Sequence, residues 1–238
     1  MRTKILVAVL VLAVCCAGFL WWQEVSSGNT FGCYTAPVMP DLLPDSGAVQ
    51  PVDCTQPHEF EVIAILTAAG AEERCRQEAE SFLGGPWEQS RTVYALLRNS
   101  DPMRGQLLCA LAETSSTDER TVGRVDSMEG GMRGDRPLAI TCLVSDEDER
   151  FLYGDCTQSH AAEFVGVVSP GGDTDIACEE AAAKYVGLPD LQQRADLRVS
   201  WVSRENELCL VTEVPDPSGR HDTLRASIKG LGTGPLPR

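Results

Sequence analysis

The sequence contains one pattern twice, about 100 residues apart. The run CTQPH at 54–58 returns as CTQSH at 156–160, and a glutamate, Glu61 or Glu163, follows three residues after each histidine. An apolar run comes next in both copies. A repeat of this length is the size of a small domain, so the pattern predicts a tandem of two small domains rather than a solenoid of short repeats.

The cysteines follow the same repeat. Two of the ten, Cys15 and Cys16, lie in an apolar N-terminal stretch, and the remaining eight form an even set. An even set in an extracytoplasmic chain predicts disulfides, and buried free thiols are the alternative. Eight cysteines allow 105 pairings. If each half closes on itself, the repeat selects Cys33–Cys54, Cys75–Cys109, Cys142–Cys156 and Cys178–Cys209.

The N-terminal stretch predicts the compartment. Arg2 and Lys4 precede an uncharged segment, 5–22, which would be about 27 Å long as a helix and close to the thickness of a bilayer core. An uncleaved signal anchor is predicted there, with residues 1–4 cytoplasmic, residues 23–30 as a stalk and the bulk of the chain outside. A cleaved signal peptide and a lipoprotein modified at a cysteine are the alternatives.

The charge of the chain excludes some partners. The formal net charge is −15. Binding to nucleic acid needs a basic surface, and docking on anionic lipid does too, so neither is expected. The acidic excess indicates a well-solvated surface instead. Contact with the membrane is therefore expected through the N-terminal helix alone.

Each half shows the same series of expected elements. In the first half these are a buried strand at 61–66, an amphipathic helix at 71–83 that ends at a Gly-Gly-Pro stop, and a hairpin of strands at 93–98 and 106–113. The second half repeats the series, with hairpin strands at 197–203 and 207–213. We therefore predict an α+β fold: two disulfide-stapled domains, 31–132 and 137–238, each a strand, a helix and a hairpin with the helix packed on a small sheet. The Gly/Pro-rich end, 230–238, is expected to fray.

The two Cys-x-x-x-His-x-x-Glu turns are the sharpest chemical signal. Thiolate, imidazole and carboxylate are all zinc ligands, but a cysteine in a disulfide cannot ligate. We therefore interpret His58, Glu61, His160 and Glu163 as structural residues that order their turns, and we expect no metal and no cofactor. The chain has no Gly-x-Ser-x-Gly, no Ser-x-x-Lys and no His-Glu-x-x-His motif, so no catalytic residue is predicted.

The repeated pattern resembles a known family. The segment from Cys54 to Val62, Cys-x-x-Pro-His-x-x-Glu-Val, is similar to the signature of the septum-formation domain of actinobacterial envelope proteins. The resemblance extends over residues 31–213 as two tandem copies, the second degenerate, with Ser159 in place of Pro57 and Phe164 in place of Val62. Its further matches are Gly32-Cys33, Cys75, Pro102, Gly105 and Cys109. The resemblance implies a role at the division septum and no particular chemistry.

These observations lead to one expectation about function. The chain is predicted to be a non-enzymatic, membrane-anchored extracytoplasmic interaction protein whose partners are envelope or division proteins, or the cell wall itself. A ligand or metal sensor that uses the two His-x-x-Glu turns is the alternative, and a cell-wall hydrolase is a minor one. A cleft with paired carboxylates would favour the hydrolase, whereas an exposed apolar patch would favour the interaction protein.

Overall fold

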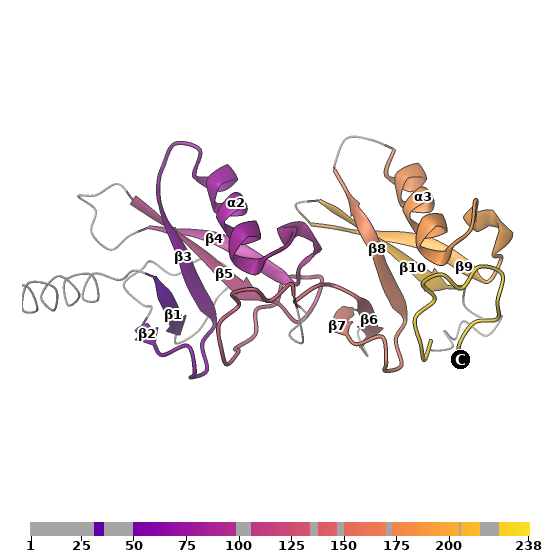
Figure 1. Cartoon of the computed structure of the whole chain (residues 1–238), viewed down its shortest axis with the longest axis horizontal. Helices are drawn as coiled ribbons and strands as arrows, with labels where there is room; N and C mark the ends of the chain where they lie inside the picture. The colour runs from indigo at the N-terminus through magenta and orange to yellow at the C-terminus, as the bar shows by residue number, and fades with distance from the viewer. Residues whose placement is uncertain are drawn as a thin grey trace, which may run out of the picture.

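The computed structural model describes residues 31–35, 50–98, 106–133, 138–146, 150–169, 173–204, 206–214 and 224–238. These residues form two halves, 31–133 and 141–238, connected by a joining segment, 138–140 (Figure 1). The halves lie side by side along the long axis of the molecule, with their helices on the same side. The signal anchor and stalk predicted at 5–22 and 23–30 lie outside the described residues.

Each half contains a five-stranded antiparallel sheet. The first sheet has the strand order β2-β1-β3-β5-β4 and the second has the order β7-β6-β8-β10-β9, so the two halves share one topology. The elements of the first half are β1 (Gly32–Thr35), β2 (Gln50–Val52), β3 (Phe60–Thr67), α2 (Ala71–Leu83), the short 3-10 helix η2 (Trp87–Gln89), β4 (Thr92–Arg98) and β5 (Gln106–Glu113). Those of the second half are β6 (Cys142–Ser145), β7 (Phe151–Gly154), β8 (Ala162–Val168), α3 (Thr174–Val186), η3 (Leu191–Gln193), β9 (Leu197–Ser203) and β10 (Glu207–Glu213).

The predicted α+β class is wrong, because the described residues are mainly β. The prediction expected a small sheet made from one strand and a hairpin, whereas each sheet has five strands and each half has a single 13-residue α-helix. The strands that were missed, β1, β2, β6 and β7, have three or four residues each, which is too short for alternation to be visible in the sequence. No helix among the described residues is long and apolar enough to span a bilayer.

The elements that were predicted from longer patterns are present. Helix α2 has the expected bounds, and it ends at Gly84, which has a φ of 77°. A positive φ at this position suits glycine, which has no Cβ to clash. Helix α3 begins after Asp173, whose carboxylate accepts a hydrogen bond from the backbone N–H of Ile176 at 3.3 Å. This is the cap that the sequence predicts.

The eight cysteines form four disulfides, in the pairs selected by the repeat. Cys75–Cys109 joins α2 to β5, and Cys178–Cys209 joins α3 to β10. Each of these strands lies between two others in its sheet. Cys33–Cys54 and Cys142–Cys156 join the short strands β1 and β6 to the turns that carry the histidines. The closed loops span 14 to 34 residues. Loops of this size are worth about 3 kcal/mol each in the chain-entropy model.

The helix phase that the repeat predicts is largely present. Cys75 and Cys178 each occupy the fifth position of a 13-residue helix and are fully buried, as are Leu83 and Val186 at the last positions. Phe82 and Tyr185, one position earlier, are half-buried rather than buried. They therefore lie at the margin of the helix face that contacts the rest of each half.

The chain after each hairpin returns to the start of its half. The segments 121–133 and 224–238 both run back past the histidine turn, where His58 bridges to Arg124 and His160 bridges to Leu224. The prediction that the tail, 230–238, is frayed is wrong. The N–H groups of Gly230 and Gly232 donate to the carbonyls of Tyr185 and Val186, at 2.8 and 2.7 Å, so the tail closes the end of α3.

Candidate functional site

The structure places the repeated His-x-x-Glu motif at the beginning of a strand in each half. In the second half His160 lies just before β8 and Glu163 is the second residue of that strand. Both side chains are fully buried. His160 Nε2 lies 3.0 Å from Glu163 Oε1, and Nδ1 lies 2.8 Å from the carbonyl oxygen of Gln158. Because both partners are acceptors, the ring carries a proton on each nitrogen and is an imidazolium.

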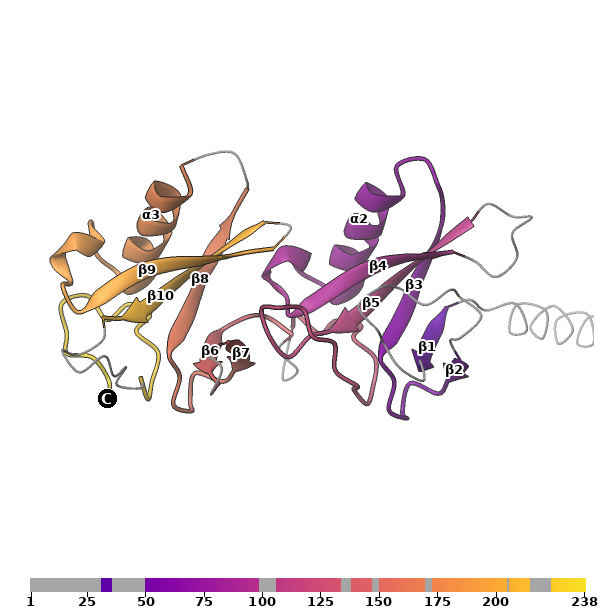
Figure 2. The same ribbon diagram turned by 180° about the vertical axis from the view of Figure 1, so that it is seen from behind.

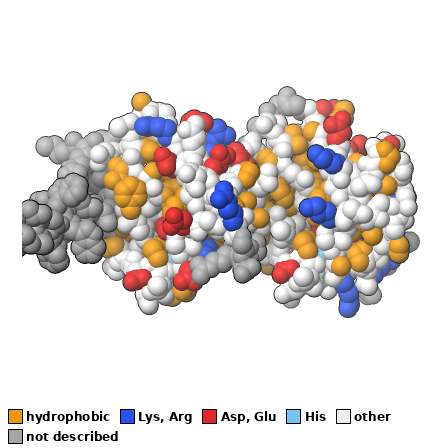
Figure 3. Space-filling model, viewed as in Figure 1, with side chains coloured by type: hydrophobic (Ala, Val, Ile, Leu, Met, Phe, Trp, Pro, Cys, Tyr) orange, Lys and Arg blue, Asp and Glu red, His pale blue; other side chains and the backbone are white. Residues whose placement is uncertain are grey.

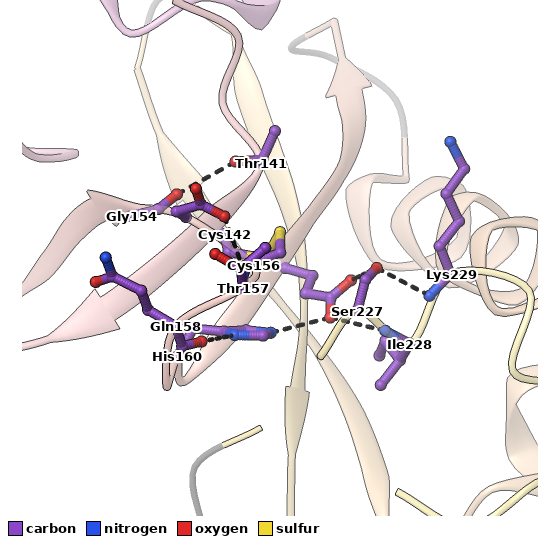
Figure 4. The surroundings of a disulfide bond; sticks show 12 residues. Thr141, Cys142, Gly154, Cys156, Thr157, Gln158, His160, Ser227, Ile228 and Lys229 are labelled. Carbon is purple, nitrogen blue, oxygen red and sulfur yellow. Dashed lines mark hydrogen bonds and ion pairs between the residues drawn. A yellow bond between two sulfur atoms is a disulfide. The ribbon is translucent and has the colours of Figure 1, made fainter. Parts of the chain in front are cut away.

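The C-terminal tail completes this cluster (Figure 4). Ser227 donates its hydroxyl hydrogen to Glu163 Oε2 at 2.8 Å, and the backbone N–H of Ile228 donates to Oε1 at 2.8 Å. Tyr185 of α3 donates to Oε2 at 2.7 Å. Together with the bond from His160, the carboxylate of Glu163 accepts four hydrogen bonds. They come from the turn before β8, from α3 and from the C-terminal tail. The cluster therefore holds three separated segments together.

The surroundings of the pair favour its charged form. Burial lowers the pKa of His160, but the hydrogen bond to Glu163, the carbonyl of Gln158 and the negative charge of Glu163 outweigh it, so the pKa is raised. Burial raises the pKa of Glu163, but its four hydrogen-bond donors outweigh burial, so the pKa is lowered. Burial, together with the negative carboxylate that its hydroxyl contacts, raises the pKa of Tyr185. The buried ion pair is consequently stable near neutral pH.

In the first half, the segment that returns after the hairpin also donates hydrogen bonds to the glutamate of the motif, but this glutamate forms no ion pair with the histidine. Glu61 accepts a hydrogen bond from the hydroxyl of Ser127 at 2.7 Å and another from the N–H of Met128 at 2.8 Å. His58 Nδ1 donates to the carbonyl of Gln56 at 2.9 Å, whereas its buried Nε2 has no hydrogen-bond partner among the described residues. Glu61 therefore takes no hydrogen bond from His58, in contrast to the pair in the second half. Phe82 replaces Tyr185 at the equivalent helix position and cannot donate.

The two clusters also contain possible metal-ligand atoms. The Sγ of Cys142 and donor atoms of His160 and Glu163 lie within 4.8 Å of one another, as do donor atoms of Cys33, Cys54 and Glu61. All three cysteines are in disulfides, which removes the thiolate that zinc would need. The donors of the His160 cluster are also fully buried and already hydrogen-bonded. The arrangement thus suits a structural role for His58, Glu61, His160 and Glu163.

A cavity lies at the junction between the two halves. Its volume is about 530 Å³. The first half contributes aromatic and acidic side chains, and the second half contributes residues of the β9–β10 turn and the start of β10. The lining includes Trp87, Glu88, Val93, Tyr94, Asp118 and Glu119 from the first half, and Ser203, Arg204, Asn206 and Leu208 from the second.

The aromatic part of the lining is rigidly packed. The rings of Trp87 and Tyr94 are in edge-to-face contact, with centroids 4.8 Å apart and an interplanar angle of 67°. Trp87 is 6% exposed. Its Nε1–H is buried and has no hydrogen-bond partner in the described part of the chain. A buried donor without a partner is uncommon, and here it belongs to a residue that lines a cavity.

Arg204, in the β9–β10 turn, holds the two halves together at this cavity. Its side chain is 7% exposed. The guanidinium donates to the carbonyl oxygens of Ser90 at 3.4 Å and Thr92 at 3.2 Å, and it contacts Glu119 Oε1 at 3.1 Å. The same group lies 3.4 Å from the hydroxyl of Tyr153. One arginine of the second half thus satisfies three acceptors on two segments of the first half.

The joining segment adds a second attachment. Ala139 forms an antiparallel bridge with Ser90, and the N–H of Arg91 donates to the carbonyl of Leu138 at 2.7 Å. Leu138 is 2% exposed and packs in the core of the first half with Leu83 and Trp87. Acidic and basic side chains lie close together along the boundary between the halves on the face seen in Figure 3. The two halves therefore meet through packing and hydrogen bonds, not through a bare linker. Figure 2 shows the β9–β10 hairpin of the second half extending toward the first half.

The carboxylates that line the cavity are bound to arginine or serine side chains and are not arranged as an acid–base pair. Glu88 forms an ion pair with Arg76 at 3.3 Å, and Glu119 with Arg204 at 3.1 Å. The hydroxyl of Ser116 donates to Asp118 and lowers its pKa, together with nearby arginines. A general acid needs a raised pKa, so Asp118 is not suited to that task.

Sequence reasoning missed the cavity, because its residues are scattered over both halves. Trp87 falls between the predicted helix and the predicted hairpin, where the sequence analysis made no prediction. Arg204 falls in the turn between the hairpin strands predicted at 197–203 and 207–213. One signal was available. Trp87 begins η2, whereas the equivalent residue of η3 is Leu191, so a large aromatic residue with a hydrogen-bond donor is present in only one copy. A difference of this kind between repeats can indicate a site that the other copy lacks.

Comparison with known proteins gives one match. A protein-family model described as "Septum formation" matches residues 67–208, which extends from the end of β3 in the first half to β10 in the second. No curated protein and no solved structure shows a significant match to the chain.

Proposed function

Because the family match covers more than half of the chain, the protein belongs to the septum-formation family, and we propose that it is a non-enzymatic, membrane-anchored interaction protein of the extracytoplasmic envelope that acts at the division septum. Its partners are other envelope or division proteins, or the cell wall. The family membership supplies the division context. The single structural observation that supports binding is the junction cavity, which both halves build and which Arg204 keeps in place.

We also propose that the two halves are two copies of the septum-formation domain, which the chain resembles in the form found in actinobacterial envelope proteins. The shared strand order and the equivalent disulfides support this proposal. The copies have different tasks. The second contains the buried ion pair and the arginine that contacts its neighbour, and the first contributes the aromatic wall of the cavity.

Two observations support a non-enzymatic role. His58 and His160 are buried and hold their turns in place, so neither is placed to exchange protons with a substrate. The carboxylates at the cavity are held in ion pairs or have a lowered pKa. A purified extracytoplasmic region is therefore expected to leave isolated peptidoglycan intact. Release of soluble fragments would contradict this part of the proposal.

Localisation tests the division role. A fluorescent fusion of the full chain is expected to concentrate at midcell during constriction, and a variant without residues 5–22 is expected to lose its membrane association. Resistance of the full chain to alkaline carbonate extraction would be the matching biochemical result. An even distribution of the fusion around the cell throughout division would contradict the septal role.

A sensor that uses the His-x-x-Glu turns is the second candidate. The observation in its favour is the close approach of Cys142, His160 and Glu163 atoms within 4.8 Å. Access to this cluster requires opening both the disulfide and the C-terminal tail. We therefore rank it below the interaction role, and metal analysis of the purified protein distinguishes the two.

A further inference from the structure

The four disulfides differ in how easily a thiol in solution can reach their sulfur atoms. The two that attach the helices have both cysteines fully buried. The two that attach the histidine turns, here called the turn disulfides, are Cys33–Cys54 and Cys142–Cys156. In each of them the strand cysteine is buried, whereas the turn cysteine, Cys54 or Cys156, is half-buried. Exchange with a thiol requires access to a sulfur, so only the turn disulfides are candidates for it.

The two turn disulfides have closely matched surroundings along the chain. Each turn cysteine follows an aspartate whose carboxylate accepts a hydrogen bond from the N–H of a threonine: Thr55 to Asp53 at 2.9 Å, and Thr157 to Asp155 at 2.8 Å. The Cα atoms of the paired cysteines are 5.1 Å apart in both disulfides. The backbone geometry therefore does not favour reaction at one of them over the other.

The ionisable groups next to the sulfur atoms are not matched. Figure 4 shows Cys142 and Cys156 close to His160. A ring nitrogen of His160 and a carboxylate oxygen of Glu163 both lie within 4.8 Å of Cys142 Sγ. In the first half a carboxylate oxygen of Glu61 lies within 4.8 Å of both sulfurs of the turn disulfide, and the histidine of that turn is not part of the group. The second turn disulfide therefore lies beside an ion pair, and the first lies beside a carboxylate bonded to neutral donors.

This difference determines how easily the buried sulfur can leave as a thiolate. In an exchange reaction a thiolate attacks one sulfur and displaces the other, and the reaction is faster when the displaced thiolate is more stable. An adjacent imidazolium, such as that of His160, stabilises a thiolate. The charge of Glu163 is balanced by that imidazolium and by three further donors, whereas the charge of Glu61 opposes a thiolate beside it. Cys142 is therefore a better leaving group than Cys33.

We propose that Cys142–Cys156 is a thiol–disulfide exchange site, at which an external thiolate attacks Cys156 Sγ and Cys142 leaves as a thiolate stabilised by His160. The bond between the two protein sulfurs breaks, and a mixed disulfide forms between Cys156 and the external thiol. A second external thiolate then attacks the external sulfur of this mixed disulfide and displaces Cys156. Two electrons and two protons pass from the external thiols to the two cysteines, and the external thiols become a disulfide.

Reduction at this site changes how one turn is attached to its sheet. Cys142 is the first residue of β6, and Cys156 lies in the turn that leads to His160. Opening the disulfide releases this turn from β6, while the bridge from His160 to Leu224 and the hydrogen bonds of Glu163 to the tail remain. The reaction needs only the oxidised chain and a thiol, so it does not depend on a role at the septum.

Differential alkylation followed by mass spectrometry measures the four disulfides separately in the full chain in detergent. Free thiols are blocked first, the folded protein is incubated with dithiothreitol without denaturant, and newly formed thiols are labelled with a heavier reagent. We expect Cys142–Cys156 to be reduced about tenfold faster than Cys33–Cys54, while the two helix disulfides stay oxidised. Reduction of all four at one rate would show that exchange follows unfolding and would overturn the proposal, as would faster reduction of Cys33–Cys54.

Two variants test the role of the neighbouring charges. His160→Gln should slow reduction of Cys142–Cys156 about tenfold, because the leaving thiolate loses its imidazolium. A purely structural role predicts the opposite sign, since a loosened turn exposes the disulfide, so an unchanged or raised rate would overturn the proposal. If His160→Gln does not fold, Glu61→Gln decides: it should speed reduction of Cys33–Cys54 about tenfold. Glu179→Gln, a charge change at an exposed position of α3, should alter neither rate. An unchanged rate at Cys33–Cys54 in Glu61→Gln would overturn the assignment.

Trapping of the mixed disulfide distinguishes a small thiol from a protein dithiol as the reactant. The first probe is the monothiol 2-mercaptoethanol, and the second is a thioredoxin variant without its second active-site cysteine, which cannot complete the reaction. A covalent complex of thioredoxin at Cys156 would support a protein partner, and an adduct of the monothiol alone would support a small thiol. Adducts mainly at Cys142, or at neither cysteine, would overturn the proposal.

Discussion

Glu163→Gln should destabilise the protein far more than Glu61→Gln, although the two glutamates occupy equivalent positions. Glu163 contacts His160 at 3.0 Å in a fully buried site, so the substitution leaves an imidazolium without its counter-charge. Removing one partner of a buried ion pair costs about 3–5 kcal/mol. Glu61 accepts only the neutral donors of Ser127 and Met128, and its loss should cost about 1–2 kcal/mol.

The pH dependence carries the sharper test. The pKa of His160 is raised in the folded state, so its contribution to stability is complete below about pH 6.5 and is lost as the pH rises through the folded value. The pKa of Glu163 is lowered, so its contribution is present above about pH 4.5 and is lost as the pH falls through its folded value. The pair therefore stabilises the fold most between these two pH values.

The substitution should reverse one of these slopes. In Glu163→Gln the largest remaining influence on His160 is burial, which lowers its pKa, so stability should increase as the pH rises from 5 to 7. Urea unfolding followed by circular dichroism at several pH values measures the free-energy difference from the unchanged protein. Equal losses for Glu163→Gln and Glu61→Gln, or a difference that does not vary with pH, would refute the assignment of a charged pair to the second half only.

Three further predictions concern the same clusters and the junction. Tyr185→Phe should lower the free energy of unfolding by about 1.5–3 kcal/mol, because the Tyr185 hydroxyl donates to a carboxylate at 2.7 Å. Urea unfolding measures this loss, and the same measurement on Phe82→Tyr should show no comparable loss. Arg204→Ala should lower the free energy of unfolding by about 2–3 kcal/mol and separate the unfolding midpoints of the two halves. A single unfolding transition at the unchanged midpoint would show that Arg204 does not couple the halves. The purified protein should contain no stoichiometric metal by mass spectrometry; one zinc per half that is lost in His58→Ala would support the sensor instead.

The sequence predicts most successfully where a pattern is long or is repeated. Helix α2 spans 13 residues with a glycine stop, and its bounds match those expected. The disulfide pairs follow from the assumption that two equivalent halves close separately, and all four are present. Both successes depend on local information, namely spacing along one helix and equivalence between two copies.

The failures concern contacts between distant segments. Strands β1 and β2 have four and three residues, and their pairing depends on the disulfide Cys33–Cys54 and on β3 rather than on their own alternation. Leaving such strands out gave the wrong fold class. The closing donors of the Glu163 cluster, Ser227 and Ile228, lie more than sixty residues away, directly before the segment 230–238 that was expected to fray. Local composition cannot show that a glycine-rich tail is held by its backbone N–H groups.

The junction was beyond sequence reasoning for the same reason. Arg204 lies in a hairpin turn, where a charged residue is normally solvated, yet its side chain is buried against the other half. Only the relative placement of the two sheets brings it to Ser90 and Thr92. A binding site between repeats therefore requires the structure, although each of the repeats can be recognised from the sequence.

Time-lapse imaging of the full chain as a fluorescent fusion tests the central claim most directly. We predict that the unchanged protein concentrates at midcell during constriction. This result would support a role at the division septum. An unchanged protein that never concentrates at midcell would contradict the claim that this protein acts through contacts at the division site.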